Sequence, residues 1–485
     1  MTTELGQQQI KNLGVYGVVR EAEVDTNLIP EGAVTEAINV HFDRKGAASL
    51  RPGITALGSS VTAGYPCWGI HNTQNGTMLV VFSAGGSSRV YAETGTVYTS
   101  NLTGGTVNVR IRFITFAGKE ICLNWGTATN QYSSIQVWTG RENNATWTTS
   151  GNPINGQNLW STLIFPEYGE VFKNRVYVVQ KNSSRLHYST VISSAGNITW
   201  DPNVNWVDIY PDDGENCSGL KRYSLELLFF KPNYIYRFRT SSTDPDPLIR
   251  IGTRSNESIV EGKKGVYFHH ESGFYRYTGG YPEEISRAIS DIVDAIPLSQ
   301  MESIVSWKDN DHIYWSVGNL TIDGSTWSNV VIRFTESSEV WTVYSYSNKI
   351  TAGMTRNTGS ALSRVVGLDN GVVTTYNSGY TDLSEPIRYR VDTKWYEWEG
   401  IVNQKVINHL VGICEKAQGS RIMYKVDNNP AWQELGQLRQ YVTSFEPISV
   451  KFHRIKFRIV GISSVEPFIF QGLQVVKGLN EGYVK

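Results

Sequence analysis

A β-hairpin of constant character recurs along the chain and restricts the possible folds more than any other sequence feature. Each copy has an apolar strand, a polar turn and a second strand rich in aromatic residues. They recur about every 40 to 55 residues, which is the size of one β-propeller blade. The spacing also fits several β-sheets without radial symmetry, but its regularity favours an all-β propeller. The copies lie at 78–91, 175–188, 226–238, 265–277, 313–341 and 365–373.

The composition points the same way. Aromatic residues make up 12% of the 485 residues, and there are 45 Gly. Aromatic side chains suit pleated, half-buried strands, and Gly supplies the positive φ angles of tight turns. The formal net charge is −1, so the chain lacks the basic balance that usually marks a nucleic-acid-binding surface. DNA could slide past a protein of this charge without tight binding of its phosphates.

The four cysteines, at 67, 122, 217 and 414, are far apart and form no CxxC pair. A zinc site and a disulfide scaffold are therefore not expected, and reduced, mostly buried thiols are. The first nine residues have neither a basic nor an apolar signal region, and no stretch approaches the roughly 18 apolar residues of a membrane span. We expect no membrane insertion by this chain.

The pattern of hairpins and longer strands in the sequence divides the chain into three parts. Residues 61–383 carry the hairpins and are predicted to form the propeller, with a short helical insertion near 283–296 where apolar residues follow a helical period. Residues 384–485 contain longer strands and are predicted to form an antiparallel β-sandwich. The segment 1–60 is expected to pair with that sandwich or with a neighbouring subunit.

One strand near the C-terminus alternates between apolar and basic residues. Ile455, Phe457 and Ile459 are expected to point one way, and Arg454, Lys456 and Arg458 the other. A solvated strand face is the ordinary interpretation of such a pattern. The three basic residues are nevertheless our candidates for contact with a partner or with DNA phosphates.

Enzyme chemistry has little support in the sequence. No nucleophile elbow, phosphate loop or HExxH motif stands at a convincing position. His269 and His270 are adjacent, but successive strand residues face opposite ways and hold one ion poorly. The acidic stretches 211–216 and 243–247 resemble calcium loops but are more typical of turns. We therefore predict no catalytic residue, no metal and no cofactor.

Three regions together resemble the tail hub or nozzle proteins of short-tailed bacteriophages, which stabilise packaged DNA. The first is the N-terminal run 25–54, which includes Asn39 and ends in the turn Arg51-Pro52-Gly53. The second covers the hairpins between 219 and 341, and the third the strands 452–459 and 468–475. Apart from Asn39 and the Arg-Pro-Gly turn, the similarity lies in patterns and not in diagnostic residues.

The resemblance implies a non-enzymatic virion protein, assembled in the host cytoplasm, that forms a ring, usually a homohexamer. Such a ring lies below the portal and adaptor proteins, retains the packaged DNA and guides its ejection without sequence specificity. Tail fibres, tailspikes or a tail needle dock on it. No catalytic residue carries over from the family.

A propeller that binds or hydrolyses glycans is the alternative. The run Asp323-Gly324-Ser325-Thr326-Trp327 resembles the Asp-box turn of sialidase propellers, but it lacks the residue expected between Asp and Gly. Hydrolysis of a glycoside usually needs two carboxylates about 5 to 10 Å apart in a cleft. This alternative therefore predicts a carboxylate pair or an aromatic platform in the central mouth of the propeller.

Overall fold

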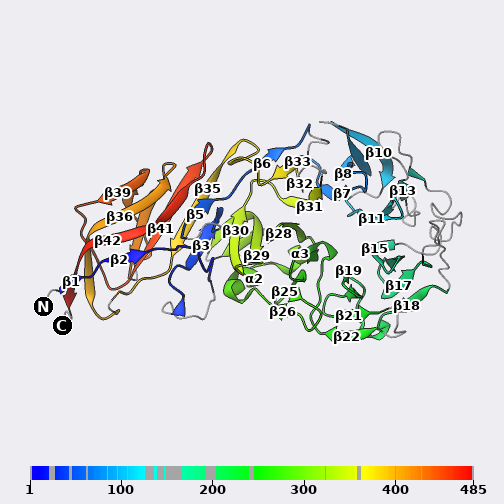
Figure 1. Ribbon diagram of the computed structural model, residues 1–485, viewed down its shortest axis with the longest axis horizontal. Helices are drawn as coiled ribbons and strands as arrows, with labels where there is room; N and C mark the ends of the chain where they lie inside the picture. The colour runs from blue at the N-terminus through cyan, green and yellow to red at the C-terminus, as the bar shows by residue number, and fades with distance from the viewer. Residues whose placement is uncertain are drawn as a thin grey trace.

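The computed structural model is an all-β protein in which a β-propeller is joined to an antiparallel β-sandwich (Figure 1). It describes residues 3–482 with the exception of 21–27, 43–45, 60, 62–63, 85, 95–96, 106–107, 126–135, 139–146, 149–165, 192–203, 240–244, 323, 358–361, 399 and 428.

Five blades of the propeller are separate four-stranded antiparallel sheets. The first contains β7 (Cys67–Asn72), β8 (Met78–Ala84), β9 (Ser87–Thr94) and β10 (Val97–Gly105). The second contains β11 (Arg112–Phe116), β12 (Lys119–Leu123), β13 (Gln136–Trp138) and β14 (Trp147–Thr148). The third contains β15 (Pro166–Phe172), β16 (Arg175–Gln180), β17 (Arg185–Tyr188) and β18 (Trp206–Asp208).

The fourth blade contains β19 (Gly219–Tyr223), β20 (Glu226–Phe230), β21 (Ile235–Phe238) and β22 (Asp246–Ile249), preceded by the 3-10 turn η3 (Pro211–Asp213). The fifth contains β23 (Val260–Glu261), β24 (Val266–His270), β25 (Gly273–Tyr277) and β26 (Glu283–Glu284), preceded by η4 (Asn256–Ser258). All five residues of β20 and of β24 are buried, which explains the apolar runs 227–230 and 266–268 within them.

Two more blades lie within a larger sheet, which gives seven blades in the described part of the chain. The sixth contains β27 (Val305–Asp309), β28 (His312–Ile322), β29 (Ser325–Thr335) and β30 (Val340–Ser345). The seventh contains β31 (Ile350–Asn357), β32 (Leu362–Leu368), β33 (Val373–Tyr376) and the early strand β6 (Ile54–Ala56). β6 pairs antiparallel with β33, so a strand that precedes the first blade completes the last one.

The first strands of the blades surround the axis of the propeller. β31 contacts both β7 and β27, β15 contacts both β11 and β19, and β23 contacts β27. The backbone of Ile111 bonds to that of Trp68 between the first two blades. This closed arrangement leaves few free sheet edges.

The sandwich contains two sheets. One has the order β39 (Tyr441–Phe445), β36 (Gln404–Lys416), β42 (Ile469–Gly482), β5 (Ala48–Leu50), β4 (Val40–His41). In addition β1 (Thr3–Leu5) and β2 (Gln8–Ile10) pair with β42, and β40 (Val450–Phe452) pairs with β36. The other sheet runs through β3 (Val34–Ile38), β35 (Glu385–Thr393), β41 (Ile455–Ser463), β37 (Arg421–Val426) and β38 (Gln433–Gln437), with β34 (Thr381–Asp382) beside β35.

The two units share one sheet and one core. β3 pairs with β30 of the sixth blade on one side and with β35 of the sandwich on the other. A single hydrophobic cluster extends from Phe457 and Phe470 in the sandwich to Trp315 and Trp341 in the propeller. Burial of this apolar cluster stabilises the junction itself as well as the propeller and the sandwich on either side of it.

The helical insertion is shorter than the predicted range 283–296. Glu283 and Glu284 form β26 because they pair with Arg276 and Tyr275 of the preceding strand. Helical structure begins with η5 (Arg287–Ile289) and continues in α2 (Ser290–Asp294) and α3 (Leu298–Met301). Ile289, Ile292 and Val293 are buried, so the predicted apolar face exists over these two turns.

Candidate functional site

Arg51, from the Arg-Pro-Gly turn, is fully buried where the propeller meets the sandwich. Its guanidinium forms a bidentate ion pair with Asp382, with distances of 2.9 and 2.5 Å. It also donates to Asn39 Oδ1 at 2.7 Å and to the carbonyl of Ser345 at 2.9 Å, and it lies 3.9 Å from the ring centroid of Tyr346. A buried charge satisfied on all sides is a structural anchor.

The other residues of the motif shape this anchor. Asn39 adopts a left-handed φ of 60° and donates to the carbonyl of Arg388 in β35. The carbonyl of Pro52 accepts from Arg51, and Gly53 lies so close to Thr381 that an added Cβ would come within 2.0 Å of its carbonyl oxygen. The motif that carries the resemblance therefore holds the two units together and does not face an open surface.

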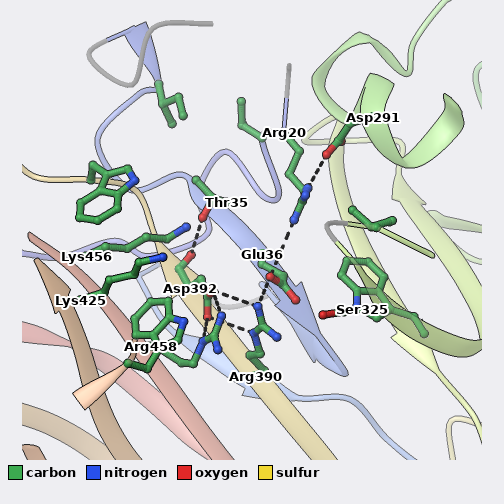
Figure 2. Close-up of a pocket in the computed structure, with 16 residues that line it drawn as sticks. Arg20, Thr35, Glu36, Asp291, Ser325, Arg390, Asp392, Lys425, Lys456 and Arg458 are labelled. Atoms are coloured by element: carbon green, nitrogen blue, oxygen red, sulfur yellow. Dashed lines mark hydrogen bonds and ion pairs between the residues drawn. The ribbon is translucent and has the colours of Figure 1, made fainter. Parts of the chain in front are cut away.

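A cleft of about 760 Å³ lies between the sixth blade and the sandwich (Figure 2). Asp291, Ile322, Ser325 and Trp327 come from the propeller, and the remaining lining comes from the sandwich and the N-terminal segment. Those remaining residues are Val19, Arg20, Ile29, Thr35, Glu36, Arg390, Asp392, Trp395, Lys425, Trp432, Lys456 and Arg458.

A chain of ion pairs crosses the cleft from the propeller to the sandwich, as the dashed lines in Figure 2 show. Arg20 Nε is 2.6 Å from Asp291 in α2, and its Nη1 is 3.7 Å from Glu36 in β3. Glu36 also pairs with Arg390, which is 3.2 Å from Asp392. The chain ends at Arg458, which holds Asp392 in a bidentate pair.

The distances in that last pair are 2.7 Å from Arg458 Nε to Asp392 Oδ1 and 2.6 Å from Nη2 to Oδ2. Burial raises the pKa of the Asp392 carboxyl, but Arg458 and Arg390 outweigh it and hold that pKa below its usual value. Asp392 is therefore ionised at neutral pH.

The predicted alternation of buried apolar and outward-facing basic residues is present in β41. Ile455, Phe457 and Ile459 are buried, and Arg458 and Lys456 both line the cleft on the other face. Arg454 lies apart from them, with its guanidinium 4.7 Å from the ring centroid of Trp395. The structure thus brings two of the three predicted residues into one site, and contact of the trio with DNA or a partner stays a prediction.

Sequence reasoning missed Lys425, Arg390 and Asp392, which complete the cleft. Lys425 lies directly opposite Lys456 on the neighbouring strand β37. Figure 2 shows the two amines side by side. Burial lowers the pKa of Lys456, against the attraction of Asp392 and Glu36. Only the alternation of β37 could have suggested Lys425 from the sequence.

The mouth of the propeller is a second charged site, formed by two adjoining hollows of about 270 and 750 Å³ at the axis. In its centre Arg112 makes a bidentate pair with Glu257, at 2.6 and 3.0 Å, and Arg110 is 3.6 Å from the same carboxylate. Burial works to raise the pKa of Glu257, but Arg112 and Arg110 lower it overall.

A second carboxylate lies beside this pair. Glu167 Oε1 is 4.0 Å from Arg112, and burial raises the pKa of Glu167 against the attraction of that arginine. The guanidinium of Arg112 lies 4.5 Å from the ring centroid of Tyr168, and Trp68 lines the same mouth. Two carboxyls with opposite pKa shifts and two aromatic rings therefore meet at the axis.

Other candidates from the sequence are occupied by ordinary contacts. His269 and His270 are buried on β24, and no group of three or more potential metal ligands occurs among the described residues. Asp213 in the stretch 211–216 pairs with Lys231 at 2.6 Å, which favours the turn interpretation, and part of 243–247 lies outside the described residues. All four cysteines are free thiols.

The tryptophan of the Asp-box-like run, Trp327, is buried against the cleft, 5.9 Å from the guanidinium of Arg20, and Asp323 lies outside the described residues. Across the described ranges, no helix has the length and apolar character needed to cross a membrane.

Comparison with known proteins gives no family. No family model matches the sequence. No curated protein matches it either. Among solved structures, virginiamycin B lyase from Staphylococcus aureus is similar at 12% identity and a TM-score of 0.43, over 68% of this chain and 98% of the lyase.

Two further structures are similar to a comparable degree. A catalytically inactive variant of the same lyase with quinupristin has 13% identity and a TM-score of 0.44, over 66% of this chain and 98% of that one. Sqt1 from Saccharomyces cerevisiae has 8% identity and a TM-score of 0.41, over 67% of this chain and 99% of its own. At these values the likeness carries nothing about activity, and the β-propeller assignment rests on the strand pairing described above.

Proposed function

We propose that this chain is a structural, non-enzymatic protein of a bacteriophage tail that assembles into a ring as the hub or nozzle. The ring, with six copies as in the family it resembles, lies below the portal and adaptor proteins of the virion. It retains packaged DNA, guides its ejection and gives fibres, spikes or a tail needle a place to dock.

The observation that carries this proposal is the rigid joint between the propeller and the sandwich. A shared sheet through β3, a shared core and the buried Arg51–Asp382 pair fix the two units against each other. A subunit that bears load in a ring needs such a joint, because a flexible linker would let the ring deform. A net charge of −1 also leaves little phosphate adhesion to stall passing DNA.

An exposed sheet edge supports the ring assembly. β39 is the terminal strand of its sheet in the described residues, and Tyr441 and Val442 on it are 67% and 60% exposed. Unpaired strand edges with apolar side chains favour association, and a heterologous contact that closes by rotation produces a ring. We assign this edge to the contact with the neighbouring subunit.

The test is the mass of the purified full-length protein, alone and after mixing with tail-less phage heads, by mass photometry. We expect a closed oligomer alone or on the heads, and a monomer for the double variant Y441E/V442E. Leu225, which is 71% exposed in a propeller turn, gives the matched control L225E. A wild-type protein that remains monomeric and ignores the heads would refute the ring.

A glycan-acting propeller is the second candidate, because Glu167 and Glu257 both lie within 4.0 Å of Arg112 in the mouth. Two neighbouring carboxyls whose pKa values are shifted in opposite directions are typical of a catalytic acid and base. The rings of Tyr168 and Trp68 offer surfaces on which a sugar ring could stack. The test is release of reducing ends from host polysaccharide by the wild type and by E167Q. Release that E167Q abolishes would favour this candidate over the structural one.

A further inference from the structure

The charges that the described residues bring to the junction cleft divide into an ion-paired set without net formal charge and a remainder. The ion-pair chain contains three arginines and three carboxylates, namely Arg20, Arg390, Arg458, Asp291, Glu36 and Asp392. Among the described residues, the other ionisable side chains that line the cleft are those of Lys425 and Lys456. The described lining therefore carries a formal excess of two positive charges.

The two lysines are placed where they repel each other. They are direct neighbours across the antiparallel pair of β37 and β41, and like charges in that position destabilise a sheet. In the part of the chain that the structure describes, neither ammonium group has a hydrogen bond or an ion pair within 4 Å. Both side chains are half-buried, so water screens the repulsion incompletely.

We propose that the cleft binds a phosphate dianion, free or as a monoester, between the ammonium groups of Lys425 and Lys456. The two negative charges of such a ligand equal the formal positive excess of the described lining. This inference does not depend on the ring role, since it concerns one subunit.

The chemistry favours phosphate over a carboxylate. A single carboxylate carries one negative charge and would leave one lysine uncompensated, whereas a phosphate dianion carries two negative charges, one for each ammonium group. Lysine is a common phosphate ligand because it acts as a compact charge with three donors. The arginines of the cleft are already engaged by Asp392, Glu36 and Asp291, and they fix the floor of the site.

The cleft also has room for an organic group. Its volume of about 760 Å³ exceeds that of one phosphate, and the rings of Trp395 and Trp432 are part of its lining. Ser325 supplies a hydroxyl on the opposite, propeller wall (Figure 2). A monoester could place its phosphate on the lysines and its organic part against these side chains.

Isothermal titration of the full-length protein at constant ionic strength, kept with chloride, tests the site. We expect inorganic phosphate to bind with one equivalent, and the double variant K425Q/K456Q to bind at least tenfold more weakly. K308Q/K477Q removes two exposed lysines elsewhere and is the matched control, for which we expect unchanged binding. No saturable binding to the wild type, or equal binding to K425Q/K456Q, would overturn the proposal.

Thermal melting gives an independent readout. In phosphate-free buffer K425Q/K456Q should melt at or above the wild-type temperature, and phosphate should raise the melting temperature of the wild type alone. A variant that melts well below the wild type in both buffers would make the lysines structural and would refute a binding role. Titrations with glucose 6-phosphate, inorganic phosphate and glucose distinguish a phosphate monoester from the free ion. If glucose 6-phosphate binds more tightly than inorganic phosphate, the ligand is a monoester. If it binds more weakly, the ligand is the free ion.

Discussion

The propeller mouth and the junction cleft are both lined with arginines and carboxylates, but their charges balance differently. Five basic residues line the mouth, Arg110, Arg112, Lys181, Lys221 and Arg254, against five acidic ones, Glu167, Glu170, Glu215, Glu257 and Glu302. Five basic residues also line the cleft, but within the described ranges only Glu36, Asp291 and Asp392 oppose them. A balanced network can hold blades together without a ligand, whereas an unbalanced one keeps a net charge that attracts an anion.

The largest expected effect comes from breaking the balance in the mouth. Arg112→Ala leaves the largely buried carboxylate of Glu257 with Arg110 at 3.6 Å and Asn256 at 3.4 Å, and removing one partner of a buried pair costs about 3 to 5 kcal/mol. Urea denaturation should show this loss of unfolding free energy. The exposed neighbour Arg222, changed to Ala, should alter stability by less than about 0.5 kcal/mol. A loss under about 1 kcal/mol for Arg112→Ala would mean that the mouth is not held by its charges.

The same kind of change in the cleft should cost less. Arg458→Ala removes two hydrogen bonds to Asp392, but Arg390 stays 3.2 Å from that carboxylate. Hydrogen bonds to charged groups contribute about 1.5 to 3 kcal/mol, and we expect a loss in that range by urea denaturation. Arg421→Ala on the neighbouring strand β37 should lose less than about 1 kcal/mol, since its ion pair with Glu434 is exposed to solvent. Equal losses at 421 and 458 would contradict the ion-pair chain.

The contribution of the Glu257 carboxylate to stability should depend on pH. Because its folded-state pKa is lowered, Glu257 contributes stability that is present above its unfolded pKa of 4.5 and is lost as pH falls through the folded value. At pH 7 we expect Glu257→Gln to cost about 1 to 2 kcal/mol. The difference between the wild type and this variant should shrink when melting is followed from pH 7 to pH 3. A difference that stays constant with pH would show that Glu257 acts through packing.

The smallest expected effect has the opposite sign. Lys425→Gln relieves the repulsion across β37 and β41, so it should raise stability by about 0.2 to 1 kcal/mol in phosphate-free buffer. Lys456→Gln relieves the same pair, so adding it should bring no comparable second gain. Lys308→Gln is the control for losing one positive charge. Additive gains from the two lysines would mean that they do not interact.

The fold was largely predictable because it repeats. The apolar runs at 227–230 and 266–268 lie in buried blade strands, and the alternation at 455–459 is a strand with one buried face. The closing strand β6 was not predicted, because three residues are too short to show a period. Residues 283–284 were wrongly included in the predicted helical range, because their pairing with β25 overrode the local helical pattern.

The sites were less predictable, because their residues meet only in three dimensions. Arg112 and Glu257 are 145 residues apart, and nothing in either local sequence indicates the other. Lys456 was named as a candidate from its strand, but its opposite neighbour Lys425 depends on the register of β37. Arg51 was named from a family pattern, and its partner Asp382 lies 331 residues later.

The closure of the seventh blade by β6 has a consequence for how the protein is made. Thr55 emerges from the ribosome early, but its contact Ser378 lies 323 residues further along. At synthesis rates of about 5 to 20 residues per second, β6 waits at least roughly 15 seconds for its partner β33. During that time the growing propeller is an open arc with unpaired edges, so chaperone protection would matter most before residue 376 has been translated.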